Sequence, residues 1–129
     1  MDNKEFGTRP ILYISGPFSH SDPIHGIDEN ILKASKIALE AWVSGWAVLC
    51  PHKNTSGFQH CNEKWEIWMD GDISFIRRMS VKAGDALLMI PDWELSEGAK
   101  LERFIAEEMG IPVYEYEKDG MPTPLTTTF

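Results

Sequence analysis

Four short apolar runs recur along the chain, and the stretches between them repeat apolar positions at steps of three and four residues. The runs cover residues 11–15, 46–50, 85–91 and 111–116. They are rich in aliphatic and aromatic residues and do not alternate with polar positions, which is typical of strands buried on both faces of a sheet. The pattern therefore predicts four buried strands.

The stretches between the strands predict helices. These helices cover residues 28–44, 63–80 and 96–109. Asp28 and Ser96 are suited to cap the first and third helices, and Gly45 and Gly110 are suited to end them. Strands that alternate with helices indicate an α/β domain with a parallel sheet of four to five strands, covered on both faces.

The predicted topology also indicates where a ligand would bind. We expect a flexible N-terminus over residues 1–9, one α/β domain over 10–116 and a tail over 117–129. Ligands of open parallel sheets lie at the carboxyl ends of the strands. That rule selects the loops over residues 16–26, 51–62 and 91–98.

Length and charge narrow the classes of function. The 129 residues are enough for one domain, and the net charge of −8 argues against a nucleic-acid polymer or an anionic membrane as partner. The start of one helix could still hold a single phosphate group. No run approaches the ~20 apolar residues that span a bilayer, and no signal peptide opens the sequence, so we expect a cytoplasmic protein.

Two cysteines and two histidines lie close together in the second loop region. They are Cys50, His52, His60 and Cys61. Their spacing does not match the usual separations of zinc ligands. A reduced protein with two incidental thiols is favoured over a metal site, and we expect neither a metal nor a cofactor.

Two carboxylates are candidates for chemistry. Glu102 follows Ser96 in the third predicted helix, and the residues alone favour a solvated Glu102 with Ser96 acting only as a cap. Gly98 would also allow a ligand to approach the backbone closely. Asp72 falls on an apolar helix face, where a carboxylate must be paired or must reach a cleft or the solvent. That face comprises Trp65, Trp68, Phe75, Ile76 and Met79. If Asp72 and Glu102 converge, one could act as a nucleophile while the other handles a proton.

Other polar residues carry weaker indications. Asp85 starts the third strand and could be a turn residue, a cap or a site member, of which the turn is favoured. The loop after Tyr13 begins with a glycine, although it lacks the spacing of a dinucleotide-binding loop. All four histidines fall in predicted loops, where one could contact a phosphate or a sugar.

Several strings of residues agree in order with one known family. They are Tyr13-Ile14-Ser15-Gly16-Pro17-Phe18, Trp68-Met69-x-x-Asp72-Ile73, Asp85, and Pro91-Asp92-Trp93-Glu94-x-Ser96-x-Gly98-Ala99-x-x-Glu102. Over roughly residues 10–116 the chain resembles the nucleoside 2-deoxyribosyltransferase superfamily, which includes the 2′-deoxynucleoside 5′-phosphate N-hydrolases. The resemblance implies a flavodoxin-like or Rossmann-like three-layer sandwich and cleavage of an N-glycosidic bond.

By this resemblance, Glu102 is the nucleophile, Tyr13 orients it, and Asp72 positions the sugar or handles the proton on the base. The same resemblance assigns substrate binding to Gly16, Pro17, Phe18, Ser19, Asp92, Trp93, Ser96 and Gly98. Within that set, Ser96, Gly98 and the loop after Gly16 would hold a 5′-phosphate, and Trp93 would lie near the base.

The resemblance leaves several alternatives open. The chain lacks a counterpart of the C-terminal asparagine segment of the transferases, which favours hydrolysis over transfer of the sugar to another base. A non-catalytic nucleotide-binding protein of the same fold is a further alternative. The loop over 16–26 lacks the arginine of some phosphate-binding relatives, for which His20 or His25 could substitute. Relatives imply a homodimer or larger homo-oligomer with sites near the interface.

Overall fold

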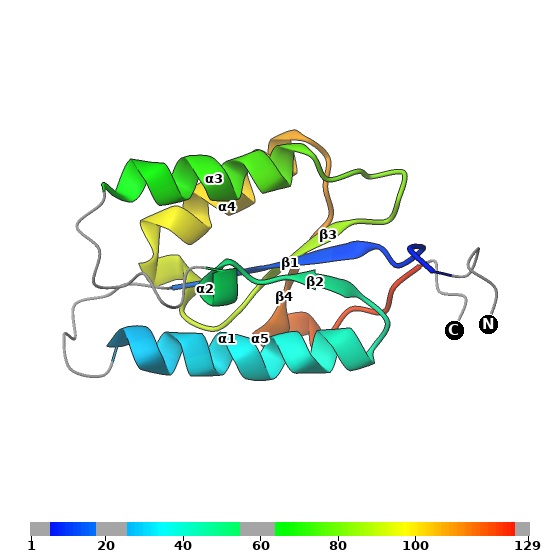
Figure 1. Cartoon of the computed structure of the whole chain (residues 1–129), viewed down its shortest axis with the longest axis horizontal. Helices are drawn as coiled ribbons and strands as arrows, with labels where there is room; N and C mark the ends of the chain where they lie inside the picture. Colours follow the sequence, from blue (N-terminus) through cyan, green and yellow to red (C-terminus); the bar gives the residue numbers. More distant parts are fainter. Residues whose placement is uncertain (1–5, 18–25, 55–63, 126–129) are drawn as a thin grey trace.

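The computed structural model describes residues 6–17, 26–54 and 64–125, and shows a parallel sheet between two layers of helices (Figure 1). The strands are β1 (Ile11–Ser15), β2 (Ala47–Leu49), β3 (Ala86–Met89) and β4 (Val113–Glu115). All three strand pairs are parallel, and the order across the sheet is β2-β1-β3-β4. The predicted three-layer α/β fold is confirmed.

The helices flank the sheet on both sides. They are α1 (Gly26–Val43), α2 (Pro51–Asn54), α3 (Trp65–Arg77), α4 (Glu97–Glu108) and α5 (Tyr116–Asp119), with a 3₁₀ turn η2 at Trp93–Leu95. In Figure 1, α3 and α4 lie over one face of the sheet and α1 and α5 lie over the other. No helix in the described ranges is long and apolar enough to cross a membrane.

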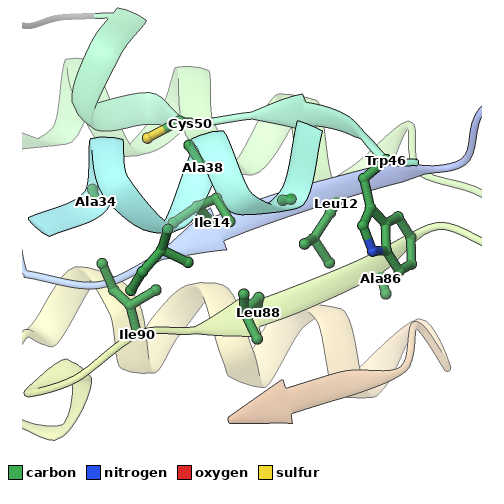
Figure 2. Close-up of a cluster of buried hydrophobic side chains, with 11 residues drawn as sticks. Leu12, Ile14, Ala34, Ala38, Trp46, Cys50, Ala86, Leu88 and Ile90 are labelled. Carbon is green, nitrogen blue, oxygen red and sulfur yellow. The ribbon is translucent and has the colours of Figure 1, made fainter. Parts of the chain in front are cut away.

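Strand β1 divides the interior into two clusters because neighbouring side chains on a strand point to opposite faces. Leu12 and Ile14 point toward α1, where they pack with Leu88 and Ile90 (Figure 2). Tyr13 packs in the second cluster, under α3 and α4. Ser15 follows Tyr13 by two positions on the strand and is also fully buried. The α3 and α4 side of β1 therefore carries two hydroxyl groups.

The helix predicted over 63–80 presents a different face to the core from the one expected. Met69 and Ile76 are buried in α3, whereas Trp65 and Phe75 are 47% and 45% exposed. The sequence predicts one wide apolar face on this helix. The sheet covers only the part of that face that contacts Tyr13 and Met89. The prediction of Trp65 and Phe75 as core residues is wrong for that reason.

Some boundaries and short elements also differ from the predictions. Asp28 lies inside α1, which begins at Gly26, so it does not precede the helix as a cap. The short elements α2, η2 and α5 were not predicted, because a single turn has no periodicity to recognise. Gly45 and Gly110 follow the ends of α1 and α4 with φ values of 109° and 76°, which confirms them as helix-ending residues.

Segments at both ends of the domain pack against it. The indole Nε1 of Trp46 donates a buried hydrogen bond of 2.8 Å to the carbonyl of Pro122. Near the other end, Arg9 Nη1 donates to the carbonyl of Trp42 at 2.8 Å, and Pro10 is buried. Part of the segment predicted as a tail is therefore anchored on the α1 side of the sheet.

Candidate active site

Glu102 lies on the inner face of α4. The helix starts at the carboxyl end of the sheet, where the Ser96 hydroxyl accepts a hydrogen bond of 3.1 Å from the Ala99 N–H, which confirms Ser96 as the N-cap. Ala99, Glu102 and Ala106 are the buried residues of the helix. Glu102 is only 5% exposed, so the solvated helix residue favoured by the sequence alone is wrong.

Two hydroxyl groups of β1 hold the carboxyl group of Glu102. Tyr13 Oη donates to Glu102 Oε2 at 2.7 Å, and Ser15 Oγ donates to Glu102 Oε1 at 2.6 Å. Both donors come from one strand face, because Tyr13 and Ser15 are two residues apart. Each carboxyl oxygen therefore has a fixed partner, which sets the position and the plane of the group.

Ser15 was missed as a site residue by the sequence reasoning. Ser15 lies within the Tyr13–Phe18 motif, but a serine within an apolar strand gives no signal of its own. The strand alternation could have found it, since Ser15 shares a face with Tyr13. A polar residue at that spacing on a buried strand needs a hydrogen-bond partner.

Asp72 brings a second carboxyl group to Glu102. It lies on α3, half-buried, and its charge raises the pKa of Glu102. Two neighbouring carboxyl groups disfavour each other's ionisation, because like charges repel. The structure thus brings Tyr13, Asp72 and Glu102 together at the carboxyl edge of the sheet, beside Ser15.

The environment raises the pKa of all three ionisable groups. Burial raises the pKa of Glu102 to about 8, against the opposing effect of the Ser15 and Tyr13 hydroxyls, while the charge of Asp72 raises it further. Burial raises the pKa of Asp72 to about 6, and its interaction with Glu102 opposes this shift. Burial and the neighbouring Glu102 raise the pKa of Tyr13, so it stays a hydrogen-bond donor. Both shifts favour a proton on the acid pair near neutral pH.

The two glycines predicted to contact substrate both have neighbours in the fold. A methyl group on Gly16 would overlap the side chain of Ile90, and one on Gly98 would lie 3.0 Å from Met69 Sδ. Gly98 therefore permits the close approach of α3 to α4, which brings Asp72 near Glu102.

Pro17 ends the described part of the first loop and is buried. Its carbonyl lies 2.7 Å from His52 Nε2, which must carry the proton because a carbonyl can only accept. Burial lowers the pKa of His52 and favours the neutral ring. Phe18 and Ser19, also predicted to bind substrate, lie outside the described residues.

Three of the four histidines, together with Cys61, fall outside the described residues. They are His20, His25 and His60. Within the described ranges no group of three or more His, Cys, Asp or Glu side chains could hold a metal ion.

Trp93 and Asp92 lie in the loop after β3. The guanidinium of Arg103 lies 4.6 Å from the centre of the Trp93 ring, and Arg103 Nη1 pairs with Glu115 Oε2 at 3.3 Å. One face of the indole is thus taken by a cation–π contact. Asp92 is exposed with a left-handed backbone, φ 70°, at the start of η2.

A small pocket of about 80 Å³ lies beside Trp93. Its lining comprises Met89, Ile90, Pro91, Trp93, Glu94, Glu115, Glu117 and Lys118. The pocket faces β4 and contains neither Glu102 nor Asp72. Sites for drug-sized ligands usually measure about 300–1,000 Å³, so this pocket is too small for a whole nucleotide.

Asp85 lies at the amino end of β3, at the opposite end of the strands from Glu102. Its Oδ1 accepts from the Ile11 N–H at 2.8 Å, and its Oδ2 accepts from the Ser80 N–H at 2.7 Å. These bonds join the start of β1 to the turn before β3. Asp85 itself follows the turn at residues 81–84 and anchors it through its side chain, and its position separates it from the acid pair.

The fold and the site define a class: a three-layer α/β domain with a buried carboxyl pair at the carboxyl edge of its parallel sheet. The model of a family described as a domain of unknown function (DUF4406) matches residues 10–115. Because this match covers most of the sequence, the chain belongs to this family. No curated protein matches the chain.

Proposed function

We propose that this protein hydrolyses the N-glycosidic bond of a nucleoside or, preferably, of a nucleoside 5′-monophosphate, with Glu102 as the nucleophile. The observation that carries the proposal is the Glu102 carboxyl group, held by Tyr13 and Ser15 and close to Asp72. The order of motifs along the chain, which resembles the nucleoside 2-deoxyribosyltransferase superfamily, supports the same chemistry.

The acid pair suits a reaction in which one carboxylate attacks while a proton reaches the leaving group. Glu102 in its ionised form attacks the anomeric carbon of the sugar, and the electron pair of the C–N bond goes to the base. In the reactive form the single proton of the acid pair lies on Asp72, which leaves Glu102 ionised, and Asp72 gives this proton to the base. The products of this step are the neutral base and a glycosyl ester of Glu102.

Water completes the proposed cycle. It attacks the anomeric carbon of the ester, the bond to the Glu102 oxygen breaks, and the proton released by the water returns to the acid pair. The hydroxyls of Tyr13 and Ser15 keep the Glu102 oxygens in place through both steps. If a second base attacks instead of water, the same ester gives base exchange, the transferase alternative.

A 5′-phosphate would lie at the start of α4. The N–H groups of the first helical turn and the positive end of the helix dipole favour an anion there. Ser96 already caps the helix through its hydroxyl, so backbone groups rather than its side chain would make the phosphate contacts. The proposed ligand is thus a small nucleoside or nucleotide. We also propose that the protein works in the cytoplasm and needs no cofactor.

A non-catalytic nucleotide-binding protein is the second candidate, and one observation favours it. Glu102 is almost fully buried and already accepts two hydroxyl bonds, as a purely structural carboxyl group would. In that case binding of a nucleotide would survive the loss of the acid, and neither protein would release a base.

The deciding experiment measures release of free base by chromatography across a panel of ribo- and deoxyribonucleosides and their 5′-monophosphates. We expect at least one substrate to be cleaved by the wild type, and Glu102→Gln to reduce the rate by at least about 10³-fold. Glu108→Gln, an exposed acid at the other end of the same helix, is the matched control and should retain full activity. If the wild type and Glu102→Gln are equally inert while calorimetry shows equal nucleotide binding, the binding protein replaces the enzyme. A second base added to the assay tests exchange.

A further inference from the structure

Arg103 follows Glu102 on α4, and its side chain contacts both the loop after β3 and the end of β4. Its guanidinium carbon lies 4.6 Å from the centre of the Trp93 ring. Its Nη1 pairs with Glu115 Oε2 at 3.3 Å, and its Nε pairs with Glu107 Oε2 at 3.5 Å. One side chain thus joins the helix of the proposed nucleophile to two neighbouring segments at the carboxyl edge of the sheet.

These contacts hold the guanidinium of Arg103 in place. The side chain is only 23% exposed. A guanidinium is planar, so it can pair with carboxylates at its edge while its face covers an aromatic ring. Glu115 is itself fixed, because its backbone N–H donates to Asp119 Oδ2 at 2.8 Å and Lys118 Nζ lies 3.5 Å from its Oε2. The guanidinium therefore keeps one position, unlike the charge of a free surface cation.

The ring of Trp93 has no comparable anchor of its own. Its backbone is set by η2, where its N–H donates to the Ile90 carbonyl at 3.2 Å and its carbonyl accepts from the Ser96 N–H at 3.0 Å. The indole N–H has no hydrogen-bond partner among the residues that the structure describes. The ring is therefore oriented by its packing against the second core cluster and by the guanidinium of Arg103.

The Trp93 ring borders the space next to Glu102. Ser15, which donates to Glu102, is the register partner of Met89 on the neighbouring strand, about 4.8 Å away. Met89 packs in the same core cluster as Tyr13 and lines the pocket beside Trp93. A planar leaving group that extends from Glu102 by one strand along the sheet therefore meets the indole.

We propose that Arg103 is a positioning residue for the base of the substrate. By covering one face of the Trp93 ring it holds the indole as a platform, and the base stacks on the other face, in the order guanidinium, indole, base. Stacking of this kind accepts any base, because every base has a π-face. The inference rests on the proposed function for the identity of the ligand. It makes Arg103 act on substrate binding rather than on bond cleavage.

Calorimetry with the nucleoside 5′-monophosphates of adenine, guanine, cytosine and uracil tests the proposal, in a Glu102→Gln background that removes the proposed turnover. Trp93→Leu should raise Kd by about 30-fold, since the loss of one stacked base corresponds to roughly 5–150-fold. Arg103→Met removes the cation and keeps the length of the side chain, so it should raise Kd by about tenfold. In a protein that already carries Trp93→Leu, Arg103→Met should have no further effect, because Arg103 acts through the ring.

Two further variants separate stacking from charge and from a general effect on the fold. Arg103→Lys keeps the charge, but an ammonium has no planar face, so its Kd should stay within about threefold of the Arg103→Met value. Arg78→Met is the matched control. Arg78 is exposed at the end of α3, where its Nη1 donates to the Ser74 carbonyl at 3.0 Å. This control should bind nucleotide as tightly as its Glu102→Gln parent.

Turnover separates this inference from the proposed function. In proteins that keep Glu102, Arg103→Met should raise KM by about tenfold and leave kcat within about twofold of the wild type. Additive effects of Arg103→Met and Trp93→Leu on Kd overturn the role of Arg103 even if base is released. So does an Arg103→Lys protein that binds as tightly as its parent. Non-additive binding without any base release overturns the proposed function and leaves the platform standing, whereas absence of nucleotide binding overturns both.

Discussion

Two buried carboxyl groups, those of Asp85 and Glu102, lie at opposite ends of the parallel strands, and the hydrogen-bond donors that surround them differ. Asp85, 4% exposed, accepts hydrogen bonds from the backbone N–H groups of Ile11 and Ser80. Glu102, 5% exposed, accepts from the hydroxyls of Tyr13 and Ser15 and lies against another acid. Equal burial therefore does not give them equal roles.

The difference lies in what each donor permits. A backbone N–H can only donate and is fixed by the fold, so it stabilises an anionic acceptor in one position. A hydroxyl can rotate and can donate or accept, so it tolerates either protonation state of its neighbour. Asp85 is thus an anchor between two segments of backbone, whereas the surroundings of Glu102 allow a proton to move.

The largest effect should come from removing the anchor. Asp85→Ala leaves the N–H groups of Ile11 and Ser80 without acceptors, and each unsatisfied buried donor costs about 1–3 kcal/mol. We expect the free energy of unfolding, measured with urea, to fall by about 2–6 kcal/mol. Base release per folded molecule should stay at the wild-type level. A loss of activity that exceeds the loss of folded protein would contradict the separation of the two acids.

The pH dependence of activity should report the acid pair. The reaction needs one proton in the pair, so kcat/KM should be highest between the pKa of Asp72, about 6, and that of Glu102, about 8. Outside this window the rate should fall by about tenfold per pH unit. A profile measured with the best substrate of the panel, flat from pH 5 to 9, would show that the pair does not act in the reaction.

The stability of the fold should fall as pH rises. The raised pKa of Glu102 means that the folded protein keeps a proton which the unfolded chain releases above its ordinary pKa of 4.5. The stabilisation is complete below pH ~4.5, declines as pH rises, and is lost above pH ~8. We expect a decline on the order of 5 kcal/mol in chemical denaturation series, since each pKa unit corresponds to about 1.4 kcal/mol.

Two variants identify the group that causes the decline in stability with rising pH. Glu102→Gln should remove most of it, because an amide does not titrate. Asp85→Asn should lower the stability and leave its slope with pH between 4.5 and 8 unchanged. An identical slope in the wild type and in Glu102→Gln would assign the decline to other groups.

The smallest effects should come from single hydroxyls. Tyr13→Phe and Ser15→Ala each remove one of two donors to Glu102, and a hydrogen bond to a charged group contributes about 1.5–3 kcal/mol. Because the second donor remains, we expect kcat to fall by about tenfold in either variant, with KM little changed. Ser74→Ala, which removes a hydroxyl on the α3 surface, is a suitable control. Unchanged kcat in both variants would mean that the hydroxyls only support packing.

The sequence alone determined the elements that depend on local pattern. The apolar runs predict the strands to within a few residues, and Ser96 predicts the start of α4. The alternation of strands and helices predicts the parallel sheet. These features follow from backbone hydrogen bonding and from the periodicity of burial, which adjacent residues already express. Glu102, Asp72 and Tyr13 became candidates only because the order of their motifs resembles one family.

The tertiary structure decided which side chains meet. The approach of α3 to α4 at Gly98 placed Asp72 against Glu102, and the register of β1 turned Ser15 toward the same carboxyl group. The tertiary structure also leaves Trp65 exposed and places the guanidinium of Arg103 over one face of the Trp93 ring. Such contacts join residues far apart in the chain and depend on helix rotation and interhelical distance, which no local pattern encodes. The burial that raises the pKa of Glu102 arises in the same way, because desolvation depends on everything that surrounds the group.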